Sequence, residues 1–176
     1  MIKLIDPDEK YLEQYQEAYL LSLKEIRLGN MKEHDLIFSN TNEINLIQKA
    51  IDAKDEKKLK AGYVPAYHFF LIDDDKFIGE VHIRTKLTSS LLNFGGNIGY
   101  GMNPKYWNQG YGNKILELSL IKAKEIGLKG KLLITCDNDN IASARIIEKN
   151  GGMLENIVKN NYNDNVIITK RYWINL

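Results

Sequence analysis

The stretch of sequence that decides the fold reads Met102-Asn103-Pro104-Lys105-Tyr106-Trp107-Asn108-Gln109-Gly110-Tyr111-Gly112-Asn113-Lys114-Ile115-Leu116. It follows a glycine-rich apolar segment and leads into an amphipathic one, which predicts a strand end, a loop and a helix start. The first turn of a helix has N–H groups without partners, and its dipole end is positive. Glycines let that backbone approach a ligand closely. The pattern therefore indicates a phosphate or pyrophosphate site.

Two nucleotide-binding motifs do not fit this stretch. A P-loop requires Gly-Lys-Ser/Thr at the helix start, whereas Tyr111-Gly112-Asn113 follows Gly110. A dinucleotide-binding fingerprint opens the first βαβ unit and carries a third glycine, whereas this pattern lies beyond residue 100 and has Ile115 at that place. A glycine-punctuated turn that binds no ligand remains the alternative.

Working outward, hydrophobic periodicity predicts one mixed α/β domain over residues 1–176. The expected order is β-αα-βββ-α-β-α-ββ. Helices are predicted at residues 9–27, 42–53, 110–127 and 140–150. Strands are predicted at residues 2–5, 68–72, 77–84, 95–102, 131–136, 153–159 and 166–174. The glycines at 95–101 predict a bend or the close approach of another backbone or a ligand. The charged stretch 54–60 is expected to be a solvated helix end or loop.

Composition excludes several classes of protein. With 44% apolar and 27% charged residues, the chain is neither disordered nor a coiled coil. The net charge of +1 provides no field for nucleic acid. A single cysteine, Cys136, excludes a disulfide framework and a Cys-based zinc site, so no metal is expected and Cys136 is expected to be a core residue. No apolar run reaches the ~20 residues of a membrane span, and residues 1–6 lack a signal-peptide core. These features predict a cytoplasmic protein that does not bind a membrane.

Two motifs resemble those of the GNAT family, the Gcn5-related N-acetyltransferases. Residues 107–112 resemble the family signature Gln/Arg-x-x-Gly-x-Gly/Ala, with Trp107 in place of Gln or Arg. Residues 100–104 resemble the family's fourth strand and its exit. Residues 140–143 and 148–151 resemble its Asn-x-x-Ser/Ala…Glu-Lys-x-Gly helix. The resemblance runs from about Phe69 to Trp173, and residues 62–66 and 136–144 look like a bacterial subgroup of predicted acetyltransferases.

The resemblance implies a GNAT acyl-CoA N-acyltransferase fold, a central and mostly antiparallel sheet flanked by helices, with acetyl-CoA as the cofactor. The N–H groups of residues 109–113 would hold the pyrophosphate. The edge of the fourth strand would pair with the pantetheine arm, and N–H groups near Gly101 and Met102 would polarise the thioester. Asn140 is expected to contact CoA, to cap its helix, or to do both. The predicted cofactor-binding residues are Tyr100, Gly101, Met102, Trp107, Asn108, Gln109, Gly110, Tyr111, Gly112, Asn113, Asn140 and Ser143.

The usual catalytic positions of the family are replaced. Asn97 stands where many members have a glutamate base, and an amide cannot take a proton. Glu80 and His82 lie on one face of the preceding strand, together with Arg84. That face either looks into the acceptor cleft, where Glu80 or His82 would act as base, or is a polar stripe in solvent. Ile147 stands at the place of the family's tyrosine acid. Tyr172 or Tyr162 would substitute unless they are core residues.

The resemblance implies an N-acetyltransferase that acts on a primary amine of a small molecule or protein. The alternative is a CoA-binding regulatory or interaction module without turnover, motivated by the replaced glutamate and tyrosine. Asp73, Asp74 and Asp75 either attract a cationic acceptor or form a turn. The apolar C-terminal residues 172–174 are compatible with a homodimer.

Overall fold

The computed structural model describes residues 1–162 and 165–176, and its strands form two antiparallel sheets. Sheet A has the order β1-β2-β3-β4, and sheet B has the order β5-β7-β6. The strands of sheet A are Ile2–Ile5, Ala66–Asp73, Lys76–Arg84 and Ile98–Met102. Those of sheet B are, in the same order, Lys131–Asp137, Asn165–Asn175 and Met153–Tyr162.

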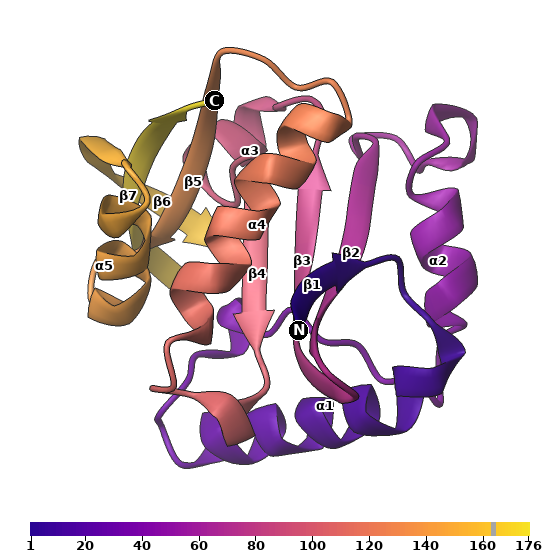
Figure 1. Ribbon diagram of the computed structural model, residues 1–176. Coiled ribbons are helices and arrows are strands. Elements are labelled where there is room, and N and C mark those ends of the chain that lie inside the picture. Colours follow the sequence, from indigo (N-terminus) through magenta and orange to yellow (C-terminus); the bar gives the residue numbers. More distant parts are fainter. Residues whose placement is uncertain (163–164) are drawn as a thin grey trace.

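Helices cover both faces of sheet A. Figure 1 shows α1 running beneath the sheet, α2 beside β2, and α4 crossing in front of β4, while α5 lies against sheet B. The α-helices α1 to α5 are Leu12–Arg27, Leu46–Asp52, Ser89–Asn93, Tyr111–Glu125 and Ile141–Lys149. Short 3₁₀ turns are found at Glu9–Tyr11, Glu33–Asp35, Glu56–Lys58 and Pro104–Tyr106.

Each face of sheet A has its own apolar core. The alternation along β3 places Val81 and Ile83 in the core that α4 and α5 cover. The opposite face packs Phe70 and Phe77 against Tyr15 of α1, with ring centroids 5.4 Å and 5.3 Å from that tyrosine. The polar side chains of β3 therefore lie on the face of sheet A that α1 covers.

The predicted mixed α/β architecture is confirmed, with three local differences. The helix predicted from residue 42 begins at Leu46, because the Asn45 side chain caps it by accepting from the N–H of Gln48. The short helix α3 was not predicted. The strand predicted from residue 95 begins at Ile98, because Gly96 has a φ of +60° and passes against the backbone of Leu133. A Cβ on Gly96 would lie 2.4 Å from the Leu133 carbonyl oxygen, so this glycine provides the close approach that was expected.

The sheet is divided rather than continuous, because β4 and β5 are not paired as strands in the described residues. Asn97 bridges them: its N–H donates to the Leu133 carbonyl at 2.7 Å, and its Oδ1 accepts from the Leu133 N–H at 2.9 Å. A search of the described residues found no helix long and apolar enough to cross a membrane.

Candidate active site

A cavity of about 1090 Å³ lies where the two sheets part. Its lining comes from β3, β4, the end of β5, the first turns of α4 and α5, and residues 29–37 between α1 and α2. Ten of the twelve predicted cofactor-binding residues line it, which are Tyr100, Gly101, Met102, Trp107, Asn108, Gly110, Gly112, Asn113, Asn140 and Ser143. The side chains of the other two lie elsewhere. Gln109 donates to the Lys105 carbonyl, and Tyr111 donates to Asp73.

The register of β3 and β4 decides which backbone groups face the cavity. The N–H of Asn103 donates to the Ile78 carbonyl, and the N–H of Arg84 donates to the Asn97 carbonyl. Hydrogen-bonded pairs alternate in an antiparallel ladder, so Gly99 and Gly101 also point toward β3. The N–H groups of Tyr100 and Met102 therefore point to the open edge. The donors expected near Gly101 and Met102 are therefore the N–H groups of Tyr100 and Met102, because the register pairs Gly101 with Glu80.

The loop before α4 has the geometry of an anion cradle. Gly110 is the N-cap residue with φ +86°, a conformation that requires glycine, and no side chain caps the helix. The Asn113 Oδ1 is buried and has no hydrogen-bond partner among the described residues. Trp107 ties the loop to β4 by donating from its indole N–H to the Met102 carbonyl at 3.2 Å. The free first-turn amides are donors that fit the pyrophosphate of CoA, whereas the Asn113 Oδ1 is an acceptor and suits a donor group of a ligand.

The start of α5 forms the facing wall. Asn140 caps this helix, and its Oδ1 accepts from the Ser143 N–H at 3.0 Å, so the capping role is present at a residue that also lines the cavity. The Ser143 hydroxyl lies 3.1 Å from the Tyr100 hydroxyl. Burial raises the pKa of Tyr100, so this hydroxyl keeps its proton.

Glu80 and His82 are not a solvent stripe, because they sit between β3 and α1. The Glu80 side chain is 1% exposed, and its Oε2 accepts from the Tyr15 hydroxyl at 2.8 Å. Its Oε1 lies 2.9 Å from His82 Nε2 and 3.6 Å from His68 Nδ1. His82 lines the cavity, whereas Glu80 does not. The structure therefore brings both predicted residues together but gives only the histidine access to a substrate.

Burial and charge set the protonation of this group. Burial acts to raise the pKa of Glu80, but the adjacent His82 and His68 outweigh it and lower the pKa to about 2. Burial also lowers the pKa of His82 below its ordinary value of 6.5, against the opposing effect of Glu80. The carboxyl is thus ionised, and the imidazole is able to accept a proton near neutral pH.

His68, Glu80 and His82 also form a donor set that transition metals accept, with ligand atoms within 4.8 Å of one another. The two imidazole rings stack, with centroids 3.8 Å apart and an interplanar angle of 25°. The chemistry of this cluster fits proton transfer as well as metal ligation.

Asn97 and Tyr172 have structural partners in place of catalytic ones. The Asn97 amide is used at both ends, since its Nδ2 donates to the Arg84 carbonyl at 3.2 Å and its Oδ1 holds Leu133. Tyr172 is 1% exposed, lies in the core and donates to Glu148 at 2.9 Å. It does not itself line the cavity, although Cys136, which does, lies near it. The expectation that Tyr172 serves as an acid is corrected on this geometry. The Tyr162 side chain lies outside the described residues.

Cys136 is buried at the cavity wall, and burial raises the pKa of its thiol to about 12.

A second polar group in the cavity was not predicted. Lys32 and His34, from the segment between α1 and α2, contact Asp137 at the end of β5. These residues are about a hundred positions apart in the chain, and no spacing rule connects them. Only the fold brings them to one wall of the cavity.

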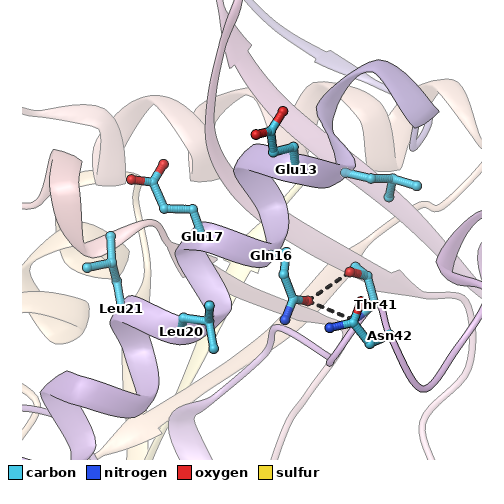
Figure 2. Close-up of a pocket in the computed structure, with 8 residues that line it drawn as sticks. Glu13, Gln16, Glu17, Leu20, Leu21, Thr41 and Asn42 are labelled. Carbon is cyan, nitrogen blue, oxygen red and sulfur yellow. Dashed lines mark hydrogen bonds between the residues drawn. The ribbon is translucent and has the colours of Figure 1, made fainter.

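A smaller depression of about 560 Å³ lies on the outer side of α1. Figure 2 shows its glutamates, Glu13 and Glu17, turned outward along the helix, while Gln16 faces Thr41. The Gln16 Oε1 accepts from the Thr41 N–H and hydroxyl at 2.9 Å and 2.8 Å. None of the predicted site residues lines this depression, so the larger cavity is the candidate site.

Solved structures share this fold. An acetyltransferase from Salmonella typhimurium that modifies the N-terminal serine of ribosomal protein L7/L12 is 17% identical, with a TM-score of 0.71 over 99% of this chain and 95% of its own. The microcin C7 self-immunity acetyltransferase MccE, solved with acetyl-CoA and AMP, is 19% identical, with a TM-score of 0.70 over 99% and 92%. A GNAT-family acetyltransferase from Bacillus anthracis is 20% identical, with a TM-score of 0.67 over 98% and 93%.

A search of curated protein sequences returned no match. The sequence profile of the acetyltransferase (GNAT) domain matches residues 30–153, which is more than half of the chain and includes the whole cavity-forming core from β2 to α5. The chain therefore belongs to the GNAT family of acetyltransferases, enzymes that transfer an acetyl group from acetyl-CoA to an amine.

Proposed function

We propose that this protein acetylates a primary amine with His82 as the general base and Glu80 as its positioning residue. The observation that carries the proposal is the single cavity that joins the anion cradle before α4 to the His82 imidazole. A ligand held at the cradle and an amine beside His82 would share that cavity. The proposal places the enzyme in the cytoplasm of a bacterial cell, where acetyl-CoA is made and used.

The base is assigned from access and protonation. An amine must lose a proton to become acetylated, and a lysine-like ammonium has a pKa near 10.4. His82 borders the cavity and is neutral near pH 7 because burial lowers its pKa. The Glu80 carboxylate, 2.9 Å from Nε2, would stabilise the imidazolium that forms and hold the ring in place. Tyr15 in turn fixes Glu80 through its hydroxyl.

Other residues would hold acetyl-CoA and stabilise the negative charge that develops on it during the reaction. The acetyl-thioester supplies the electrophile when it is bound. The outward N–H of Met102 would donate to the thioester oxygen as it gains negative charge, and that of Tyr100, two residues away on the same edge, would pair with the pantetheine arm. The Tyr100 and Ser143 hydroxyls would donate hydrogen bonds to the departing sulfur, and solvent would supply its final proton. Residues 108–113 would bind the pyrophosphate.

The proposed acceptor is a small molecule or a flexible protein terminus. Residues 29–37 border the acceptor side, and Ile37 packs on Gly101, so a folded protein surface has little room there. Among the structural relatives, the Salmonella enzyme acts on a protein N-terminus. The alternative of a CoA-binding module without turnover rests on the replacement of the usual base by Asn97. His82 provides another base, which favours the enzyme.

The test is release of free CoA thiol from acetyl-CoA with a panel of primary amines. His82→Ala should lower kcat by about 100-fold or more, while the Kd of acetyl-CoA changes little. Glu80→Gln should lower kcat by about 10-fold and shift the pH profile, because the ring loses its charged partner. His68→Gln should lower kcat by less than His82→Ala does, since His68 stacks on His82 and lies 3.6 Å from Glu80 but does not line the cavity. Binding of acetyl-CoA with no thiol release for any amine would support the module instead.

A further inference from the structure

The acceptor side of the cavity carries an acidic wall at the end of β5. Asp137 is 2% exposed and lines the cavity. Its Oδ2 accepts from Lys32 Nζ at 2.8 Å and lies 2.8 Å from His34 Nε2. Its Oδ1 is buried and has no hydrogen-bond partner among the described residues. A buried carboxylate with one oxygen unpaired is costly in a folded protein, so a cationic ligand would find it incompletely neutralised.

The surrounding charges reinforce this wall. Asp139 also accepts from Lys32, at 2.6 Å and 2.8 Å, and Asp35 lines the same part of the cavity. Burial, and then the charge of Asp137, raises the pKa of Asp35 to about 6, which indicates that negative charge accumulates here. Arg84, one of the two arginines that line the cavity, donates to the carbonyl oxygens of Gly95 and Gly96 at 3.0 Å and 3.2 Å. It is therefore already engaged elsewhere.

Lys32 shows what kind of group this wall binds. Its side chain is 47% exposed, and it reaches Asp137 from the segment between α1 and α2. An ammonium on an exposed, flexible side chain is displaced at less cost than a buried one. A free ligand with the same group could take its place without leaving a buried cation unpaired.

We infer that Asp137 determines acceptor specificity by binding a cationic group of the substrate in place of the Lys32 ammonium, which selects an acceptor with two amino groups. The inference rests on the proposed function and names its substrate class. The bound ammonium is not the amine that reacts, because a carboxylate partner stabilises the protonated form and removes its nucleophilic lone pair. The second amino group, left free of the wall, is the one presented to His82.

Binding tests this directly and does not depend on turnover. Calorimetry on the CoA complex would compare butane-1,4-diamine with butane-1,4-diol, which has the same length but no amino group. The diamine should bind at least tenfold more tightly. Asp137→Asn should weaken diamine binding by about 30-fold and leave diol binding within about 2-fold. Lys32→Met should strengthen diamine binding, because the competing ammonium is gone. A thermal melt verifies that each variant is folded.

Asp75→Asn is the matched control, because it removes the same charge from the exposed turn between β2 and β3. It should change neither affinity by more than about 2-fold, since exposed charges are screened by salt. Equal affinity for the two probes, or equal losses in Asp137→Asn and Asp75→Asn, would overturn the inference. So would weaker diamine binding in Lys32→Met.

Thiol release separates this inference from the proposed function. Selective diamine binding without thiol release would support the Asp137 assignment and count against acetyl transfer to this acceptor. Thiol release at equal kcat/KM with butane-1,4-diamine and butan-1-amine, and unchanged by Asp137→Asn, would support acetyl transfer and overturn the specificity assignment.

Discussion

The position of Asn97 in the family motif did not reveal the role of its side chain, which is structural. It stands where the family resemblance places a base, yet its amide and its backbone bind Leu133 and the Arg84 carbonyl. An amide suits this place because it donates and accepts at once, which a carboxylate does not. In the proposed mechanism the proton is accepted from a neighbouring strand, by His82, which lines the cavity.

Asp35 gives a prediction about pH and stability at this scale. Its pKa is raised from an ordinary 3.8 to about 6, first by burial and then by Asp137, so the folded protein binds this proton more tightly than the unfolded chain. Stability is therefore lost as the pH rises from about 4 to about 6. Asp35→Asn should raise the free energy of unfolding by about 1–2 kcal/mol at pH 7.5 and change it little at pH 4, allowing for partial solvent screening. Urea denaturation at the two pH values measures this, and an equal gain at both would contradict it.

The sequence predicted part of the candidate site for identifiable reasons. Period-two alternation put Glu80 and His82 on one face, and the glycine pattern found the start of α4. The partners Tyr15, His68 and Lys32 were not predicted, because their contacts to the site cross long stretches of chain. Tyr172 was offered as an acid only because tyrosine has the right chemistry, and its burial against Glu148 shows that residue type alone is weak evidence.

At the scale of elements, the two glycines before and within α4 have different causes. Gly110 is required by its positive φ and has no heavy atom near its missing Cβ. A Cβ on Gly112 would instead lie 2.5 Å from the Ile146 Cδ1 of α5, so this glycine permits close helix packing. The motif therefore combines a backbone requirement with a packing one, and only the first concerns the anion cradle directly.

Gly112→Ala tests that distinction. Alanine gains up to about 1 kcal/mol over glycine within a helix, but here the added methyl must push the end of the Ile146 side chain aside. Gly112→Ala alone should therefore stabilise the protein by clearly less than that gain. The double variant Gly112→Ala/Ile146→Val should recover more of it, because the terminal methyl that clashes is removed. Chemical denaturation of the single and double variants gives the coupling energy, and additive effects would mean that Gly112 is required for a reason other than contact with Ile146.

Elements were predicted best where the pattern is local. The β2–β3 hairpin and the helix α4 lie near their expected places, because alternation and helical periodicity are written within each segment. The start of α2 was placed too early, because several polar residues precede it and only Asn45 makes the cap. The helix α3 is a single turn fixed by Thr88, too short for periodicity to detect.

At the scale of the molecule, the cavity lies where the two sheets part, so a ligand that binds there would also stabilise the folded protein. The open edge of β4 faces the cavity, so a bound pantetheine would add hydrogen bonds where the protein has none of its own. The sequence did not reveal this division, because strand pattern does not specify which strands pair. The resemblance supplied the expectation of an arm between the strands, and the register of β3 and β4 identified the groups available to it.

Acetyl-CoA should therefore raise the Tm measurably. A ligand at 100 times its Kd stabilises the folded state by about 2.7 kcal/mol, which for a chain of this size is a shift of about 5–10 °C. Differential scanning fluorimetry with acetyl-CoA, CoA, ATP and NAD measures it. The first two should shift the Tm and the last two should not. A shift with ATP or NAD alone would be incompatible with the cavity as a CoA site.

The two sheets are also separate in the order of the chain. Every strand of sheet A ends by Met102, and every strand of sheet B begins at Lys131 or later. During synthesis, the core that α1 covers has all its residues once β3 has emerged, whereas the core that α4 and α5 cover lacks most of its packing partners at that point. Domains generally fold as units, so the chain should complete its fold only when the second sheet has followed.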